Sequence, residues 1–295
     1  MKILVLGING MLGHKAWQVL RTRFGDAAVF GAMRQQRRAF AGCELFAADN
    51  IVEGVDARDA AAMQQLLDRI RPEVVFNCIG VTLRRPELDD PVAVMEVNSL
   101  LPHRLAAWCA RARARLIHIS TDCVFRGDRG GYVETDAADA VDLYGRSKAL
   151  GEPPGALTLR TSIVGRELRG ERGLLDWFLS QRGGRVQGYT RATWSGVSTL
   201  YLAGLVATLI ERFPALAGLY HVAGESLTKY DLLQHFDQAF GTRTTIVPDE
   251  GHAIRRDLNG ARFQAATGLC PPPWREMAAQ VAEEAALYAK WRNEC

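Results

Sequence analysis

The stretch KILVLGINGMLG, residues 2–13, decides the fold of this chain. A short aliphatic run is followed at once by Gly7, Gly10 and Gly13, and then by a periodic segment that reaches about residue 24. This order is typical of a buried strand, a glycine turn and a helix. A turn without side chains lets backbone N–H groups and the positive helix end approach a diphosphate. The spacing GxxGxxG differs from the common GxGxxG, so a purely structural turn is the alternative interpretation.

The same order of strand and helix recurs through the first half of the chain. Further strands are predicted at 28–33, 74–79, 116–119 and 156–159, and helices at 57–69, at 92–113 and beyond residue 144. Strands that alternate with helices need crossover connections, which produce a parallel sheet covered on both faces. We therefore expect an α/β fold, a doubly wound parallel sheet of the Rossmann type.

The alternation becomes irregular beyond about residue 165. One apolar helix is expected near 200–210, a strand at 218–224, and amphipathic helices at 229–240 and 274–289. We expect a dinucleotide-binding domain over residues 1–165, to which 196–222 returns. A smaller, partly interleaved C-terminal substrate lobe is expected from 166–195 and 223–295.

The composition indicates a compact enzyme and names no large partner. Of the 295 residues, 48% are hydrophobic, which is enough to bury a large core. The 36 basic and 33 acidic residues leave a net charge of +3 without a long like-charge block, so no nucleic-acid partner is expected. No apolar run is long enough for a membrane span, and a cytoplasmic protein is expected. The six cysteines lack metal-ligand spacing, so we expect free thiols, no disulfide and no metal.

The residues at the end of the second predicted strand indicate which nicotinamide cofactor the chain prefers. In doubly wound folds an acid there favours NAD, whereas an arginine favours NADP by pairing with the 2′-phosphate. Here the strand ends in Arg34, with Arg37 and Arg38 close behind it. NADP(H) is therefore preferred over NAD(H), and a solvated basic loop is the alternative.

Tyr144 and Lys148 are four residues apart, so a helix places them on one face. Reduction of a ketone by hydride needs a proton donor, and the usual tyrosine pKa near 10 suits neutral pH badly. A lysine charge about 5 Å away favours the phenolate by roughly 3 kcal/mol. Thr121 follows the predicted strand 116–119, at the sheet edge where ligands bind, and is expected to hydrogen-bond the substrate carbonyl. The alternatives are an exposed pair of helical side chains at Tyr144 and Lys148 and a simple turn at Thr121.

Three segments in order carry a resemblance to a known family. They are the three glycines, the run STDCVFRG at 120–127 and the run YGRSKALGE at 144–152. Over about the first 165 residues the chain resembles the extended short-chain dehydrogenase/reductases, and among them most of all the dTDP-4-dehydrorhamnose reductases. The resemblance implies NADPH-dependent reduction of the C4 ketone of a nucleotide-activated 6-deoxy sugar. Its product would feed polysaccharide or glycoside assembly, as in dTDP-rhamnose biosynthesis.

The resemblance also implies roles for single residues. Tyr144 becomes the proton donor, Lys148 lowers the pKa of Tyr144 and holds the nicotinamide ribose, and Thr121 fixes the carbonyl. The cofactor is then expected to contact Gly7, Gly10, Met11, Leu12, Gly13, Arg34, Asp56, Cys78, Ile79, Gly80, Asn98, Tyr144 and Lys148. The nucleotide-sugar substrate is expected at Thr121, Asp122, Gln187, Trp194, Ser195, Arg255 and Arg256. Asp56 is assigned as an adenine-contacting acid after a short strand at 54–55.

Other activities of the same superfamily stay open. Nucleotide-sugar dehydratases carry a glutamate after the Thr-Asp pair, where this chain has Cys123, so dehydration is disfavoured. A nucleotide-sugar epimerase uses the same threonine, tyrosine and lysine and is one alternative. A non-catalytic NADP-binding regulatory subunit is the other, since a fold does not prove a reaction. The sequence leaves the oligomeric state open and allows a homodimer.

Overall fold

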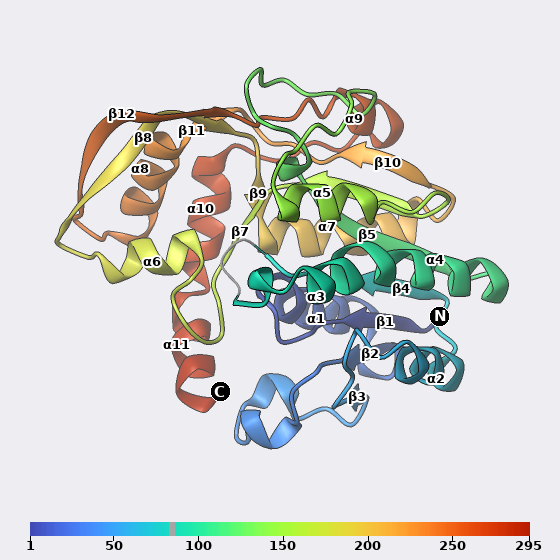
Figure 1. Ribbon diagram of the computed structural model, residues 1–295. Helices are drawn as coiled ribbons and strands as arrows, with labels where there is room; N and C mark the ends of the chain where they lie inside the picture. Colours follow the sequence, from blue (N-terminus) through green and yellow to red (C-terminus); the bar gives the residue numbers. More distant parts are fainter. Residues whose placement is uncertain (83–85) are drawn as a thin grey trace.

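The computed structural model describes residues 1–82 and 86–295 (Figure 1). Its main sheet has seven strands in the order β10-β6-β5-β4-β1-β2-β3, and every pair of neighbours is parallel. The strands are β1 Ile3–Leu6, β2 Val29–Ala32, β3 Ile51–Val52, β4 Val74–Asn77, β5 Arg115–Thr121, β6 Leu157–Thr161 and β10 Gly218–His221. This order confirms the predicted doubly wound sheet. The chain adds strands outward on one side from β1 to β3 and then on the other side from β4, so the strand order reverses between β1 and β4.

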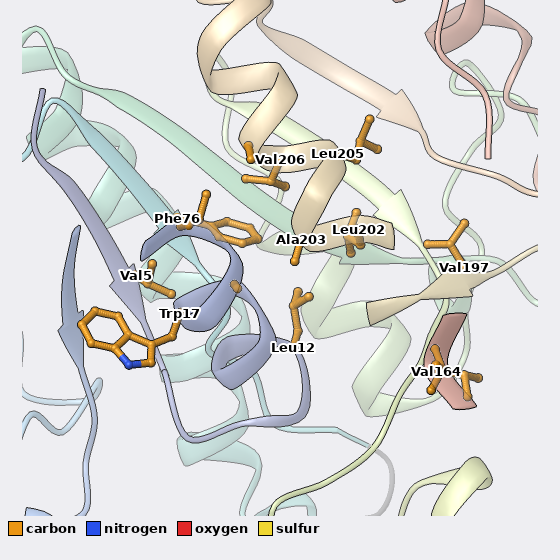
Figure 2. Packing of buried hydrophobic residues seen from close by; sticks show 14 of the residues in the cluster. Val5, Leu12, Trp17, Phe76, Val164, Val197, Leu202, Ala203, Leu205 and Val206 are labelled. Atoms are coloured by element: carbon orange, nitrogen blue, oxygen red, sulfur yellow. The ribbon is translucent and has the colours of Figure 1, made fainter. Parts of the chain in front are cut away.

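The sheet is covered on both faces, which explains the continuous apolar runs of its strands. Ile3 and Val5 of β1 belong to one apolar core, whereas Leu4 and Leu6 belong to another. Helices α1 (Met11–Phe24) and α7 (Thr199–Arg212) pack together over the first core, as Figure 2 shows. The second core includes α2 (Ala60–Ile70) and α4 (Leu101–Ala112).

Three local predictions need correction. The single helix expected at 92–113 is α3 (Pro91–Met95), a π-helical turn (Glu96–Leu100) and α4. The helix expected at 274–289 is α10 (Trp274–Glu283) and α11 (Ala285–Glu294), which are separated by Glu284. The short strand expected at 54–55 lies at Ile51–Val52, because that pair aligns with Gly31 and Ala32 of β2.

A separate, three-stranded sheet has the strand order β11-β8-β12. Its strands are β8 Arg185–Trp194, β11 Leu227–Thr228 and β12 Thr245–Arg255, with α6 (Leu174–Ser180) and α8 (Lys229–Phe240) beneath them in Figure 1. The two long strands were not predicted from the sequence. The remaining elements are β7 Ile163–Val164, β9 Val197–Ser198, α5 Leu143–Leu150, α9 Ala261–Thr267 and short 3-10 turns at Asp26–Ala28, Arg37–Phe40, Glu44–Phe46, Pro86–Asp89 and Asp122–Val124.

The C-terminal helix α11 returns to the first helix of the chain. His14 Nε2 lies 2.7 Å from the Tyr288 hydroxyl, and buried Lys15 pairs with Glu284 at 2.8 Å. The structure joins Cys43 and Cys295 by a disulfide, which corrects the expectation of free thiols only. The two cysteines are 252 positions apart, so only the tertiary path brings them together. The domain bounds drawn from the sequence stay a proposal.

Two features are absent from the described residues. No helix within 1–82 and 86–295 is long and apolar enough to cross a membrane. In the same ranges, no group of His, Cys, Asp and Glu side chains is arranged to hold a metal ion.

Candidate functional site

The glycine turn is required by close backbone contacts. Gly7 has a φ of 80°, in the region that favours glycine, and its N–H donates to Ala32 O at 2.8 Å. A Cβ on Gly13 would lie only 1.9 Å from Gly7 O. Gly10 is the N-cap residue of α1. The three glycines therefore let the start of α1 press against the end of β1, and the turn opens onto a cavity.

This first cavity, of about 490 Å³, lies along the carboxyl ends of β1, β2 and β4. Of the residues predicted to bind the cofactor, its wall contains Gly7, Gly10, Met11, Arg34, Asp56, Cys78, Ile79 and Gly80. Arg58 donates to the Asp56 carboxylate at 2.6 Å and holds its pKa below the usual value, with a smaller contribution from the Arg34 charge. The sequence did not single out the wall residues Arg58, Glu167, Arg169 and Arg172.

Asn98 and Gly13 lie behind the wall rather than in it. The Asn98 amide accepts from Val81 N at 2.9 Å and donates to Val81 O at 3.0 Å and to Ser147 Oγ at 3.1 Å. A Cβ on Gly151 would lie 1.8 Å from Asn98 O, so the π-helical turn and the end of α5 are in close contact. The geometry of Asn98 is that of a side chain that fastens the segment after β4 to α5.

A second cavity, of about 1060 Å³, extends from the glycine turn to the three-stranded sheet. Met11, Leu12, Cys78, Ile79 and Gly80 lie at its start. Its wall also contains Thr121, Tyr144 and Lys148, so the structure brings the three predicted catalytic residues into one cavity.

Helix α5 carries Tyr144 and Lys148 into this cavity. Its first turn is capped by Asp142, whose side chain accepts from Gly145 N at 2.8 Å. A Cβ on Gly145 would lie 2.2 Å from Cys123 O, so only glycine allows α5 to approach the turn after β5 this closely. The YGRSK run therefore positions the tyrosine beside Thr121 through its glycine as well as through its spacing.

The ionisation of Tyr144 and Lys148 is governed first by burial. Burial raises the pKa of Tyr144 above its usual value, and a hydrogen bond with Thr121 opposes this rise. This direction differs from the lowering that a nearby lysine alone predicts. Burial lowers the pKa of Lys148 to about 8, the charge of Glu152 opposes this shift, and its Nζ donates to Ile119 O at 2.7 Å.

Polar groups surround Thr121 at the end of β5. Its hydroxyl accepts from Cys123 N at 3.1 Å and lies 3.2 Å from a carboxylate oxygen of Asp122. Burial raises the pKa of Asp122, while the charges of Lys229 and Arg256 act in the opposite direction. Burial also raises the pKa of Cys123 to about 12, so this thiol stays protonated at neutral pH.

The residues predicted for the substrate divide into two groups. Asp122, Gln187, Trp194 and Arg256 line the second cavity together with Thr121. Ser195 and Arg255 lie outside the wall of this cavity, and their substrate contacts stay a prediction. The Ser195 hydroxyl accepts from Leu258 N at 2.8 Å inside the protein, and Arg255 is exposed because neighbouring residues of β12 point to opposite faces.

Lys229 is the wall residue that sequence reasoning missed most clearly. It starts α8, and its Nζ lies 3.6 Å from the centre of the Trp194 ring. The indole Nε1 of Trp194 is buried without a hydrogen-bond partner among the described residues. A signal existed, since Lys229 is one of five lysines and follows the helix-capping Thr228. Gln181, Arg185, Tyr189 and His252 also line the cavity and were not predicted.

Three curated proteins are similar to the chain over most of its length. A probable low-salt glycan biosynthesis reductase from Haloferax volcanii is 32% identical over 82% of this chain and 81% of its own. A probable dTDP-4,6-dihydroxy-2-methyloxan-3-one 4-ketoreductase from Streptomyces antibioticus is 29% identical over 93% and 92%. The methionine adenosyltransferase 2 subunit beta of Rattus norvegicus is 26% identical over 81% and 72%.

Solved structures agree on the fold. The dTDP-4-dehydrorhamnose reductase of Bacillus anthracis in complex with NADP superimposes with a TM-score of 0.77 at 20% identity, covering 97% of this chain and all of the other. The family model described as the RmlD substrate binding domain matches residues 1–287. The chain therefore belongs to the RmlD substrate-binding family, which confirms its predicted resemblance to the dTDP-4-dehydrorhamnose reductases.

Proposed function

We propose that the chain is an NADPH-dependent reductase that acts on the C4 ketone of a nucleotide-activated 6-deoxy sugar. One observation carries this proposal: Thr121, Tyr144 and Lys148 line a single cavity that begins at the glycine turn. Membership of a family that includes reductases supports it. The two similar curated proteins named as reductases act, by their names, in glycan biosynthesis and on a dTDP-linked ketone.

The residues of the first cavity fit a dinucleotide phosphate. The turn at Gly7 and Gly10 presents the start of α1 to the cavity, which is the arrangement that binds a diphosphate. Arg34 lies on the same wall, where a guanidinium suits the extra phosphate of NADP. When bound, the nicotinamide supplies the hydride.

The protein supplies the proton and the orientation. Tyr144, hydrogen-bonded to Thr121, is placed to share the substrate oxygen with that threonine and to give it a proton as the alkoxide forms. A raised pKa keeps Tyr144 protonated at neutral pH, so it is ready to donate. The Lys148 ammonium, held by Ile119 O, stabilises the tyrosinate that remains.

The test is NADPH consumption by the purified protein with dTDP-4-keto-6-deoxy-L-mannose, followed by absorbance. We expect turnover in the wild type and a loss of about 10²- to 10⁴-fold in Tyr144→Phe, in a variant that still binds NADPH. Wild-type protein that binds NADPH but reduces no 4-keto sugar nucleotide contradicts the proposal.

The similarity to methionine adenosyltransferase 2 subunit beta favours one second candidate, a regulatory NADP-binding subunit. A binding subunit has no chemical need for a buried tyrosine and lysine beside a threonine. NADPH binding without turnover, together with a stable complex with another enzyme, would favour that candidate. A cofactor that stays bound through turnover would instead favour an epimerase.

A further inference from the structure

The disulfide between Cys43 and Cys295 joins α11 to a segment of the first cavity's wall. Cys295 directly follows α11, and Cys43 belongs to segment 34–46, which follows β2 (Figure 1). This segment supplies Arg34 and Phe40 to the wall. The disulfide therefore fixes the position of a segment that forms part of the proposed cofactor site.

A second segment of the same wall meets the first one at the disulfide. Segment 167–172 contributes Arg169 to the wall, among other residues. Arg169 Nε donates to Cys295 O at 2.6 Å, and its Nη2 donates to Ala39 O. Its guanidinium carbon lies 4.3 Å from the centre of the Phe40 ring. Arg169 thus connects both wall segments with the residue that carries the disulfide.

The other contacts between segment 34–46 and α11 are largely exposed to water. Glu44 N donates to a carboxylate oxygen of Glu294 at 3.2 Å, and the Glu44 carboxylate pairs with Lys290. The side chains of Lys290 and Glu44 are 53% and 69% exposed. Exposed ion pairs contribute little to stability, because water competes for both charges. Without the disulfide, Arg169 and these exposed groups are left to hold segment 34–46 in place.

Segment 167–172 is fastened to α11 independently of the disulfide. Arg292 donates to Glu167 O from Nε at 3.0 Å and from Nη2 at 2.9 Å. The same Nη2 lies 2.6 Å from a carboxylate oxygen of Asp176, whose side chain is fully buried. Loss of the disulfide is therefore expected to release one wall segment and to leave the other in position.

We propose that the Cys43–Cys295 disulfide is a redox-sensitive latch, which holds segment 34–46 against α11 and which a dithiol reductant opens. Opening it loosens the wall and lowers the affinity for the dinucleotide. The inference rests on the proposed function for the identity of that dinucleotide. Because the wall segment must be in place for binding, the affinity falls with the fraction of molecules in which it is.

The opening reaction is a thiol–disulfide exchange. A thiolate of the dithiol attacks one sulfur, the bond between Cys43 and Cys295 breaks, and the second thiol then resolves the mixed disulfide. Two electrons and two protons pass to the two cysteines, and the dithiol leaves as a disulfide. Cys295 is partly exposed whereas Cys43 is buried, so we expect the attack at the sulfur of Cys295.

The experiment compares NADPH binding in the oxidised and reduced forms of the full chain. Peptide mass spectrometry without reductant first establishes the bond, and fluorescence titration then gives Kd before and after treatment with dithiothreitol. We expect Kd for NADPH to rise about 3- to 10-fold on reduction. Cys43→Ser and Cys295→Ser are expected to show the weaker Kd with and without the reductant. Cys270→Ser, at an exposed free cysteine, is the matched control and keeps the wild-type response.

Hydrogen exchange shows whether the effect is local. On reduction we expect faster exchange in segment 34–46 and little change in segment 167–172, because Arg292 still holds the latter. A general loosening of the fold would raise exchange in both. Equal Kd values in the two redox states, an oxidised protein without the bond, or an equal rise in both segments overturns the inference.

Neither measurement needs the sugar nucleotide, so the inference and the proposed function fail separately. A redox-dependent Kd in a protein that reduces no 4-keto sugar nucleotide leaves the latch standing and removes the function. Turnover with a Kd that ignores the redox state does the reverse.

Discussion

The two sheets of the molecule differ in how their strands are covered. All four residues of β1 are buried, because helices lie on both faces of the parallel sheet. β8 alternates between buried and exposed residues, and β12 is exposed along most of its length. The first kind of strand leaves an apolar run that stands out in the sequence. The second kind leaves a mixed run that looks like a loop, and yet it builds a wall of the larger cavity.

The comparison predicts that substitutions of the proposed catalytic residues beside the parallel sheet have the largest effect on activity. We expect Lys148→Met to reduce kcat by about 10²- to 10⁴-fold in the NADPH assay, because the buried ammonium that supports Tyr144 is lost. Lys290→Met, at an exposed lysine of α11, serves as the control and retains activity. Unchanged kcat in Lys148→Met would remove that residue from the proposed mechanism.

The next largest effect is expected from a substitution in the glycine turn. Gly13→Ala places a Cβ against Gly7 O, and we expect a loss of about 1–3 kcal/mol in the free energy of unfolding, with loss of NADPH binding. Gly204→Ala lies in α7 with open space around its Cβ, so it is expected to stabilise the protein by about 0.5–1 kcal/mol. Denaturant titration of both variants checks the contrast, which fails if they behave alike.

The cofactor preference depends on the end of β2. Arg34→Gln is expected to weaken NADPH binding by about 10- to 100-fold and to leave NADH binding nearly unchanged, because only NADPH carries the 2′-phosphate. Arg38→Gln, at an exposed position outside both cavity walls, is the matched control. Fluorescence titration with the two cofactors measures the difference. Equal losses for NADPH and NADH contradict the assignment.

The smallest effect is expected at the end of β12, where Arg256 lines the larger cavity and its neighbour Arg255 does not. Arg256 lines the cavity and donates to Phe125 O at 3.1 Å, whereas Arg255 is exposed. We expect Arg256→Gln to raise KM for the sugar nucleotide by about 10-fold and Arg255→Gln to leave it unchanged. Steady-state kinetics compares the pair, and a larger effect at Arg255 would reverse the assignment.

The sequence located the residues of the proposed chemistry but not everything that positions them. Thr121, Tyr144 and Lys148 were predicted because strand ends and helical spacing are local properties, and the structure places them in one cavity. Ser195, just after β8, and Arg255, at the end of β12, lie outside the cavity wall, and neither strand was predicted from the sequence. Lys229 gained its significance only from Trp194, a neighbour that is distant in the sequence.

By itself, the sequence determined the parallel sheet, the glycine turn and the face of α5 that carries Tyr144 and Lys148, because apolar periodicity and glycine placement act within a few residues. Tertiary structure alone decided three other features. It raised the pKa of Tyr144 through burial, joined Cys43 to Cys295, and placed the Trp194 ring beside Lys229. Each depends on contacts between residues that the chain separates widely and only packing brings together.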